Sequence, residues 1–348
     1  MGTAFVIHYL TMLRVAINGF GRIGRNAFKA GWSKKGITFV AVNDLTEPKI
    51  LAHLLKHDSV FRTWGHRVSA DTKNIIVDGV KIPVTAEKDP AMLPWKSFKV
   101  DVVIESTGRF TKLEGAKGHL KAGAKRVVIS APSADAPTYL EGVNAHKAKA
   151  SQKIVNNASC TTNCIAPPAA VIAATLGIKK AMMTTVHSVT AEQNLVDGLP
   201  PPGHPDLRRA RSALTNMIPT TTGAAIATTE TIPSLKGKFD GIAIRVPTLD
   251  VSLTDFTFLT KKKTTVEKVN AIFKKAAKSP LMRGILGVTD EPLVSADFIG
   301  NTYSSIVDLA MTKVVDGDLV KVLAWYDNEW GYSQRLIEMV MRIGKLAK

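Results

Sequence analysis

The stretch Leu13–Gly24, which reads LRVAINGFGRIG, decides the fold of the first half of this 348-residue sequence. Its apolar segment Leu13–Asn18 is typical of a buried β-strand, and it leads directly into the pattern G-x-G-x-x-G formed by Gly19, Gly21 and Gly24. The first glycine permits a tight turn, the second lets the backbone approach a pyrophosphate, and the third lets a helix pack on the strand. The stretch therefore predicts a dinucleotide-binding turn.

The residues after this turn strengthen the prediction. Ile23–Ser33 has helical spacing, and the N–H groups at the start of such a helix attract a phosphate. A second strand, Thr38–Asn43, leads into Asp44, twenty positions after Gly24. A carboxylate there binds ribose hydroxyls and repels a 2′-phosphate, which favours NAD over NADP as the cofactor. The simpler alternative is a glycine-rich turn with Asp44 capping a helix.

Short apolar strands continue to alternate with helical patterns through the first half. Asp101–Glu105 and Arg126–Ser130 are strand candidates, and Leu113–Ala122 between them has helical spacing. This alternation is typical of an α/β fold, here a Rossmann-type doubly wound parallel sheet. Val68–Ala86 instead alternates with period two around Asp78-Gly79, which predicts an antiparallel hairpin.

The pattern changes after about residue 160, where a helix is followed by long strand candidates and a final amphipathic helix. The change predicts an α+β catalytic domain with a mainly antiparallel sheet and helices on one face. We therefore expect an NAD-binding Rossmann domain at 12–159, completed by a C-terminal helix within 327–348, a catalytic domain at 160–326 and an N-terminal extension at 1–11. The strand and helix candidates are Lys180–Ser188, Gly241–Val246, Ser252–Leu259, Leu319–Tyr326 and Ser333–Leu346.

Composition and charge narrow the class of protein. The sequence is 45% hydrophobic and 22% charged, has no apolar run of membrane-spanning length and lacks the features of a signal peptide, so we expect a cytoplasmic protein without a membrane partner. Its net charge of +17 raises the alternative of a nucleic-acid partner. The densest lysine cluster coincides with helical spacing of apolar residues, so a solvated helix face that attracts phosphorylated metabolites is the preferred interpretation.

The two cysteines, Cys160 and Cys164, are too few and too close for a disulfide framework, and no second cysteine pair suggests a zinc site. Cys160 follows the strand candidate Lys153–Asn157 and stands where a helix begins, so the helix field would stabilise its thiolate. His187 ends a strand among polar residues and could form a thiolate–imidazolium pair with Cys160. Sequence spacing alone leaves open whether the two meet, and a packing role for the cysteine is the alternative.

A set of phosphate-binding candidates lies between residues 207 and 245. Leu207–Arg211 carries three guanidinium groups, Pro219–Gly223 offers hydroxyls and backbone N–H groups, and Arg245 closes a strand. Arginine suits fork-like recognition of phosphate, although surface or interface arginines would give the same pattern.

From about Leu13 to the C-terminus, these residues resemble the phosphorylating, NAD-dependent glyceraldehyde-3-phosphate dehydrogenase family. The most specific match is NNASCTTNC at Asn156–Cys164. The other matching segments are INGFGRIGR at Ile17–Arg25, VNDL at Val42–Leu45, AEKDP at Ala86–Pro90, STG at Ser106–Gly108, ISAPSADAP at Ile129–Pro137, TTVHSVT at Thr184–Thr190, TTTGAA at Thr220–Ala225, RVPT at Arg245–Thr248 and WYDNEWGYS at Trp325–Ser333.

The resemblance implies a role for each matching residue. Cys160 would be the nucleophile and His187 the base, with inorganic phosphate and glyceraldehyde 3-phosphate as substrates in glycolysis or gluconeogenesis. The cofactor would contact the glycine loop through Gly19, Gly21, Arg22, Ile23 and Gly24, and also Asp44, Lys88, Ser130 and Asn328. Thr190 and Arg245 would hold the phosphate of the substrate, and inorganic phosphate would lie among Ser159, Thr161, Arg208, Thr222 and Gly223.

The resemblance also implies a homotetramer and a hemithioacetal and thioester on Cys160. Lys88 stands where the family usually has arginine, and the loop Gly198–Pro205 is longer than the usual form. Erythrose-4-phosphate dehydrogenase of the same fold is the nearest alternative. A basic nucleic-acid-binding protein that uses the dinucleotide groove and a structural protein with an inactive site are alternatives of other classes.

Overall fold

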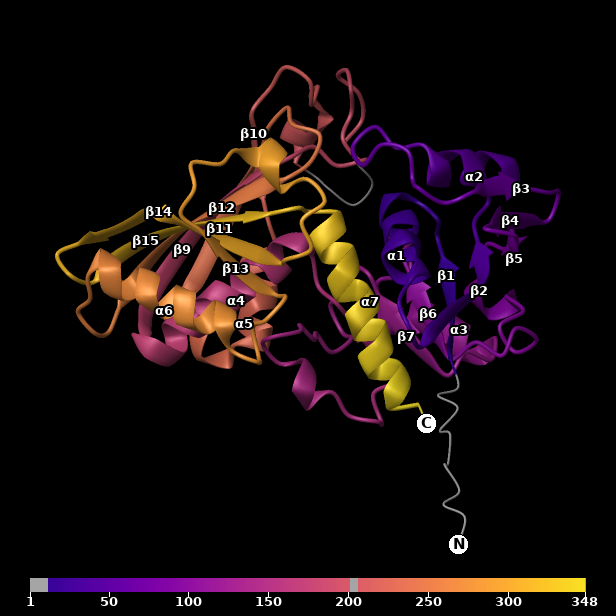
Figure 1. Ribbon diagram of the computed structural model, residues 1–348, viewed down its shortest axis with the longest axis horizontal. Helices are drawn as coiled ribbons and strands as arrows, with labels where there is room; N and C mark the ends of the chain where they lie inside the picture. Colours follow the sequence, from indigo (N-terminus) through magenta and orange to yellow (C-terminus); the bar gives the residue numbers. More distant parts are fainter. Residues whose placement is uncertain (1–11, 201–205, 348) are drawn as a thin grey trace, which may run out of the picture.

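The computed structural model describes residues 12–200 and 206–347. Their strands form two sheets, one of eight strands from the first half of the chain and one of seven strands from the second half (Figure 1). The N-terminal extension at residues 1–11 lies outside the described residues, as does most of the proline-rich part of the loop Gly198–Pro205.

The first sheet has the strand order β3-β4-β5-β2-β1-β6-β7-β8. All strands from β5 to β8 along this order pair in parallel, whereas β3, β4 and β5 pair antiparallel, so the predicted parallel sheet and hairpin are both confirmed. The strands are β1 (Leu13–Asn18), β2 (Ile37–Asn43), β3 (Val68–Ala70), β4 (Asn74–Val77), β5 (Val80–Thr85), β6 (Val102–Glu105), β7 (Arg126–Ile129) and β8 (Ile154–Asn156).

Helices cover both faces of this sheet, as a doubly wound fold requires. Val15 and Ile17 on β1 enter the core shared with α1 and α7, whereas Ala16 faces the opposite core around Trp95. Alternate side chains of one strand therefore serve two layers. The helices are α1 (Arg22–Trp32), α2 (Pro48–Lys56), α3 (Leu113–Lys121) and α7 (Trp330–Lys345). The sequence analysis did not predict α2.

The last helix, α7, packs beside the first, and Figure 1 shows it running between the two sheets. Its apolar side chains, including Leu336 and Val340, share a core with β1, although more than 300 residues separate them in the chain. Arg126 on β7 donates a hydrogen bond to the carbonyl of Leu346, just beyond the helix. The C-terminus is thus part of the structure formed by the first half of the chain.

The second sheet has the order β10-β11-β9-β12-β15-β14-β13, and four of its six strand pairs are antiparallel. Along β12 every second residue is buried, and Phe256 and Phe258 pack toward the helices α4, α5 and α6 on one face. The elements are β9 (Ile178–His187), β10 (Ile218–Thr221), β11 (Phe239–Arg245), β12 (Ser252–Thr260), β13 (Leu286–Thr289), β14 (Ser305–Val315), β15 (Leu319–Tyr326), α4 (Cys160–Thr175), α5 (Ala224–Thr231) and α6 (Val266–Lys278).

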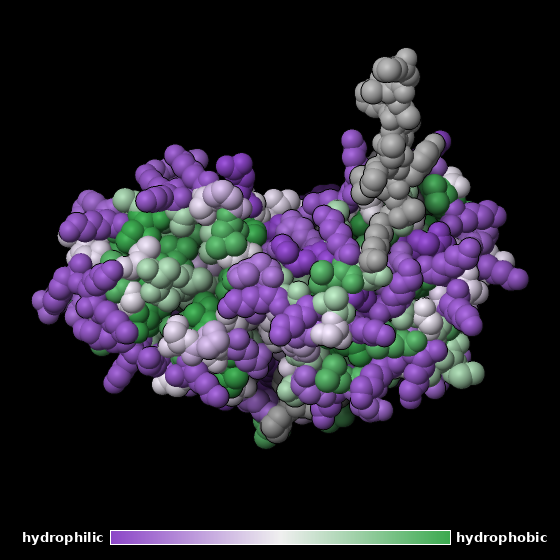
Figure 2. Space-filling model, turned by 90° about the horizontal axis from the view of Figure 1, so that it is seen from below, coloured by the Kyte–Doolittle hydropathy of each residue, from purple (hydrophilic) through white to green (hydrophobic). Residues whose placement is uncertain are grey.

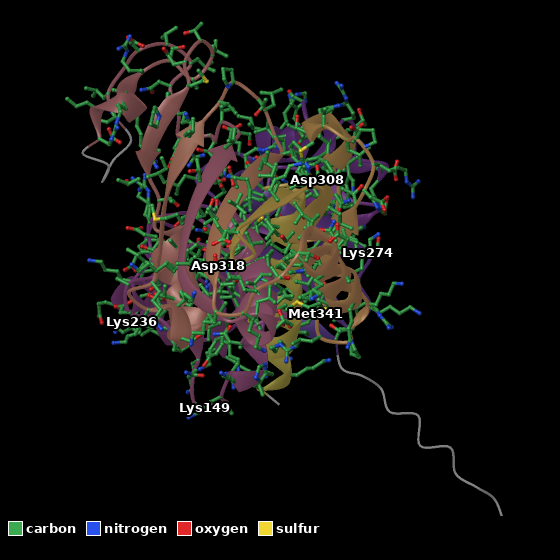
Figure 3. The ribbon with its side chains drawn as sticks, turned by 90° about the vertical axis from the view of Figure 1, so that its left-hand side faces the viewer. Lys149, Lys236, Lys274, Asp308, Asp318 and Met341 are labelled. Carbon is green, nitrogen blue, oxygen red and sulfur yellow. The ribbon has the colours of Figure 1, made fainter. Side chains whose placement is uncertain are left out.

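The lysine-rich segment forms α6, with Val269 and Phe273 buried and its lysines exposed, which confirms the predicted solvated face. Figure 3 shows the side chains of this half of the molecule, with Lys274 labelled at one side. Figure 2 shows hydrophilic side chains spread over the viewed face with small apolar patches between them. No helix within residues 12–200 and 206–347 is long and apolar enough to cross a bilayer.

Replacing Gly24 with alanine is expected to lower the free energy of unfolding by about 1–3 kcal/mol, the usual cost of overpacking. A Cβ atom at Gly24 would lie 2.1 Å from the carbonyl oxygen of Gly19, a backbone atom that cannot move aside. Denaturant unfolding of the variant and the parent protein measures this change.

Gly21→Ala is the matched control, because a Cβ atom there would meet no atom within 4 Å. Its stability should stay near that of the parent. If Gly24→Ala proved as stable as Gly21→Ala, the close packing of α1 on the glycine loop would not contribute to stability.

Candidate active site

The glycine-rich turn and the end of β2 form one side of a cleft at the carboxyl edge of the first sheet. Gly19 has φ +90°, and a Cβ atom there would lie 2.7 Å from the backbone nitrogen of Thr107. Asp44 accepts a hydrogen bond from the backbone N–H of Phe20 (2.8 Å), so the carboxylate also fixes the turn. The cleft is lined by Asn18, Gly19, Gly21, Asn43, Asp44, Leu45, Glu87, Lys88, Ser106, Thr107, Arg109 and Phe110.

These residues fit a dinucleotide. Gly21 precedes the first turn of α1 and faces open space, so a pyrophosphate can approach the backbone N–H groups there. Ile23 lies in that first turn, and Gly24 packs on Gly19 behind it. Of the residues that the sequence analysis assigned to the phosphate and ribose, Gly19, Gly21 and Asp44 therefore share one cleft with Lys88.

The guanidinium group of Arg22 is held by two carboxylates. It forms ion pairs with Asp58 (2.7 Å) and with Glu329, which precedes α7. Because its side chain is engaged, Arg22 would contact a pyrophosphate through its backbone N–H. The ion pairs instead connect the start of α1 to the residue that follows Asn328.

Asn328 and Ser130 are not among the residues that line this cleft. Ser130 follows β7, where its N–H donates to the carbonyl of Glu105 (2.9 Å). The side-chain oxygen of Asn328 accepts hydrogen bonds from the hydroxyls of Ser188 (2.8 Å) and Ser252 (2.7 Å). In this orientation the NH₂ group of Asn328 is the remaining side-chain group that can donate to a ligand.

Cys160 is the first residue of α4, as the sequence analysis predicted. Just before it, Ala158 has φ +52°, a left-handed conformation that costs a residue with a side chain about 1 kcal/mol. Two hydrogen bonds hold this strained residue, from its N–H to the side chain of Asn156 (2.9 Å) and from the Tyr332 hydroxyl to its carbonyl (3.1 Å). The side chain of Ser159 then caps the helix by accepting from the N–H of Thr162 (3.1 Å).

His187 at the end of β9 meets this cysteine. Its Nε2 lies 3.5 Å from Sγ of Cys160, so the pair that sequence spacing left open is present. The imidazole is buried, and the Tyr326 ring stands edge-on to it with centroids 5.9 Å apart. Its Nδ1 lies 2.7 Å from the carbonyl oxygen of Ser188 and 2.9 Å from Nη1 of Arg245.

The surroundings act on both ionisable groups. Burial raises the pKa of the Cys160 thiol above its ordinary value, whereas the positive charge of Arg245 opposes that shift. Burial, and then the charge of Arg245, lower the pKa of His187 to about 3. Cys164 lies deeper in α4, where burial raises its pKa to about 12, and is therefore unreactive.

Arg245 is the charged group nearest this pair. It ends β11, directly beside His187 in the parallel register of β9 and β11. Its Nη1 also lies 3.4 Å from the hydroxyl of Thr190, so the two residues that the sequence analysis assigned to the phosphate of the substrate are adjacent.

Thr161, Thr222 and Gly223, which the resemblance assigned to inorganic phosphate, lie in different environments. Thr161 is buried, and its hydroxyl pairs with that of Tyr326 (3.0 Å). Thr222 and Gly223 precede the first turn of α5, where Thr222 accepts from the N–H of Ala224 (3.2 Å) and Gly223 is exposed. Backbone N–H groups at such a helix start suit an anion.

Arg208 and Arg209 differ sharply. Arg208 is exposed, and its guanidinium turns back onto the carboxylate of Asp206 (2.8 and 3.0 Å). Arg209 is buried, donates to the hydroxyl of Thr220 (3.1 Å) and to Glu192 (2.8 Å), and its charge lowers the pKa of His187. The environment of Arg209 therefore suits a site residue better than that of Arg208.

Several supporting residues escaped the sequence analysis because their sequence patterns carry no chemical signal. They are Tyr326, which bonds both Thr161 and Thr185, and the serines that hold Asn328. Within residues 12–200 and 206–347, no group of three or more His, Cys, Asp or Glu side chains is arranged to hold a metal ion.

Comparison with known proteins agrees with this geometry. Residues 13–113 match the model of the glyceraldehyde 3-phosphate dehydrogenase NAD-binding domain, and residues 159–328 match that of the C-terminal domain of the same enzyme. The chain is 52% identical to glyceraldehyde-3-phosphate dehydrogenase 1 of Bacillus cereus over 94% of its length and 97% of that protein. It is 51% identical to the enzyme of Geobacillus stearothermophilus (95% and 98% covered) and 48% identical to enzyme 1 of Saccharomyces cerevisiae (96% and 100%). With both domain models matched and such identity over nearly the whole length, this chain belongs to the glyceraldehyde-3-phosphate dehydrogenase family.

Proposed function

We propose that this protein catalyses the NAD-dependent oxidation and phosphorylation of D-glyceraldehyde 3-phosphate to 1,3-bisphosphoglycerate. The observation that carries the proposal is the contact between Sγ of Cys160 and Nε2 of His187, placed at the start of a helix and beside Arg245. The relatives that carry the name of this enzyme support the choice of substrate.

The chemistry begins at Cys160. Its thiolate attacks the aldehyde carbon, and the backbone N–H of Cys160 together with His187 stabilises the developing oxyanion of the hemithioacetal. NAD, when bound, supplies the acceptor for the hydride that leaves this carbon. His187 takes the hydroxyl proton as the hemithioacetal becomes a thioester on Cys160, and inorganic phosphate then displaces the sulfur.

The site residues divide between cofactor and substrate. Gly19, Gly21, Arg22, Ile23, Gly24, Asp44, Lys88 and Ser130 would hold NAD, and the amide NH₂ of Asn328 would donate to its carboxamide. Arg245 and Thr190 would bind the phosphate of the substrate. Inorganic phosphate would lie near Ser159, Thr161, Thr222 and Gly223, and we assign Arg209 rather than Arg208 to that site because Arg209 is buried and its charge acts on His187, whereas Arg208 is exposed.

The domain division follows from the same roles. We propose an NAD-binding domain at residues 12–159 completed by 327–348, and a catalytic domain at 160–326. Separate hydrophobic cores for the two sheets support this division, as does the packing of α7 on α1.

We also propose a cytoplasmic homotetramer. On β9 and β11, Met182 and Ile242 are exposed on the sheet face opposite the helices, a feature that suits burial against another copy. The need for a reduced thiol on Cys160 suits the cytoplasm. Analytical ultracentrifugation tests the oligomeric state, and a monomer at micromolar concentration would contradict the tetramer.

The experiment that tests the function follows NADH absorbance with glyceraldehyde 3-phosphate, with and without inorganic phosphate. We expect sustained turnover only when phosphate is present, because the thioester must be displaced. A higher rate on erythrose 4-phosphate, independent of phosphate, would favour the alternative dehydrogenase. A short oligonucleotide that NAD fails to displace would favour the nucleic-acid-binding alternative.

Replacing Asp44 with alanine is expected to weaken NAD binding about 10- to 100-fold, the value of a hydrogen bond to a charged group. The same change removes a negative charge from the place of the ribose, so the affinity for NADP should fall less or rise. Titration calorimetry with both cofactors measures the ratio of the two affinities.

Asp44→Asn is the matched control because its side-chain oxygen can still accept from the N–H of Phe20 and hold the glycine turn. It should change the NAD to NADP ratio without loosening the turn. An unchanged ratio in both variants would show that Asp44 does not select the cofactor.

A further inference from the structure

Glu105, the last residue of β6, is a buried carboxylate with four hydrogen-bonding groups around it. Its Oε1 accepts from the backbone N–H of Thr107 (2.9 Å) and from the hydroxyl of the same residue. Its Oε2 lies 2.6 Å from the amide nitrogen of Asn18 and 2.9 Å from Nε2 of His119, and these two nitrogens are 3.5 Å apart. The contacts beyond these neighbours decide in which direction each hydrogen bond points.

The indole of Trp95 fixes the hydrogen on His119. Nε1 of Trp95 lies 2.9 Å from Nδ1 of the imidazole, and an indole N–H can only donate, so Nδ1 must carry a lone pair. The proton of the neutral ring is therefore on Nε2 and points at Glu105. Both rings are fully buried, so the imidazole cannot turn to other partners without leaving the indole N–H unpaired. His119 therefore acts only as a donor to this carboxylate.

The opposite end of the same row fixes Asn18. Its side-chain oxygen accepts from Nδ2 of Asn43 (2.7 Å), so its NH₂ group faces Glu105. Asn43 is oriented in turn by the backbone of Glu87, whose carbonyl accepts from Nδ2 (2.8 Å) and whose N–H donates to Oδ1 (2.9 Å). A backbone carbonyl and N–H cannot exchange roles, so neither asparagine can turn its amide over without losing hydrogen bonds.

These contacts form one chain of hydrogen bonds across the carboxyl ends of adjacent strands, in the order β5-β2-β1-β6. The chain points toward Glu105 from both ends, so residue 105 must accept on both oxygens. From the indole to the loop after β5, the members of the chain are Trp95, His119, Glu105, Asn18, Asn43 and Glu87. The last three and Thr107 line the dinucleotide cleft, whereas Glu105 and His119 are not among its lining residues.

We infer that Glu105 and His119 are positioning residues for the dinucleotide. The carboxylate holds Asn18 and Thr107 in the arrangement that accepts NAD, and His119 supplies a donor that keeps the carboxylate in place. The inference rests on the proposed function, since it takes NAD as the ligand of this cleft.

The affinity for the cofactor depends on this chain because its members differ in their freedom to move. A donor in place of one oxygen of Glu105 would face other donors. Thr107 is partly exposed and precedes the exposed Gly108, so it can shift away from such a donor, whereas the buried His119 cannot. Binding of NAD would then have to reverse the shift, and the cost would appear in the affinity for NAD.

The test replaces Glu105 with glutamine, which has the same size but turns one acceptor into an NH₂ donor. We expect the dissociation constant of NAD to rise at least about 10-fold, because a buried donor loses its acceptor. Calorimetry on the full-length protein without substrate measures this constant. In steady-state kinetics the KM for NAD should rise far more than kcat falls, a split that loss of folded protein alone would not produce. An unchanged affinity for NAD in Glu105→Gln would overturn the inference.

His119→Met and His119→Gln form a matched pair. Methionine fills the space but removes the donor to Glu105, so NAD should bind about 3- to 10-fold more weakly. The NH₂ group of glutamine reaches the place of Nε2, so His119→Gln should recover most of that loss. Binding of NAD to His119→Met as tight as in the parent, or equal weakening in both variants, would contradict the role of His119. This pair also tests the chain if Glu105→Gln does not fold.

Ile104→Val is the control for stability. Ile104 precedes Glu105 on β6 and packs in the core shared with α1 and α7, so its truncation lowers the free energy of unfolding without removing a hydrogen bond. Denaturant unfolding measures the stability of each variant, and Ile104→Val should bind NAD like the parent. If NAD affinity instead fell in proportion to stability in every variant, the role of the chain would be structural only and the inference would be wrong.

The two hypotheses fail in different ways. If the parent protein produces NADH from glyceraldehyde 3-phosphate and phosphate but NAD affinity is unchanged in Glu105→Gln and His119→Met, the proposed function stands and the positioning role is wrong. If the parent protein binds NAD but produces no NADH from this substrate, the proposed function is wrong, and the affinities of the variants still decide the role of Glu105.

Discussion

Cys160→Ser is expected to lower the rate of NADH formation by at least about 10⁴-fold, in line with the loss of a catalytic nucleophile in other enzymes. A serine hydroxyl is less acidic than a thiol. The helix N-terminus and His187, which suit a thiol, would therefore ionise it poorly. NAD affinity should stay near that of the parent, because Cys160 does not line the cleft around Asp44. Steady-state kinetics and calorimetry measure the two quantities.

Cys164→Ser is the matched control. Its sulfur lies 3.7 Å from the hydroxyls of Thr254 and Ser305, so a serine finds hydrogen-bond partners in the same pocket. This variant should keep most of its activity. A Cys160→Ser protein that retained a substantial part of the activity would exclude a thioester on Cys160.

His187→Asn is expected to reduce the rate of NADH formation near pH 7 by about 10²- to 10⁴-fold, the usual contribution of a general base. Without an imidazole to take the proton, the thiol must ionise to solvent, and burial has raised the pKa of Cys160. The variant should therefore recover part of its rate as the pH rises, over a higher range than in the parent. A pH–rate profile measured from neutral to alkaline pH tests this.

The exposed His146 offers a matched control, since His146→Asn removes an imidazole far from any catalytic assignment. Its pH–rate profile should coincide with that of the parent. If His187→Asn merely scaled the rate down by one factor at every pH, His187 would position the substrate rather than move a proton.

Local patterns predicted much of the fold because the first half follows simple rules. The strand of Leu13–Asn18, the glycine turn and Asp44 lie close together in the chain. A short stretch of sequence is therefore enough to predict the structure around each of them. One element defied such rules. The helix from Cys160 contains Pro167 and Pro168, and this proline pair removes two backbone hydrogen-bond donors. The helix nevertheless continues, because its side chains are buried against the second sheet.

The reactive residues of the site were predictable from the sequence, but the contacts that hold them in place were not. Cys160 and His187 carry chemical signals in their own side chains, whereas their contact depends on the pairing of distant strands with α4. Three neighbouring arginines at 208, 209 and 211 look alike in sequence, and only the fold turns Arg209 inward. The position of Arg245 also depends on register, since the pairing of β9 with β11 sets it beside His187.

The place of α7 has a consequence for how the protein is made. The apolar face of β1 leaves the ribosome more than 300 residues before Leu336 and Val340, which cover it. The first sheet must therefore keep part of its core exposed until α7 has been synthesised. The strained Ala158 before Cys160, whose carbonyl accepts from the hydroxyl of Tyr332, is likewise held in place only after α7 has been synthesised.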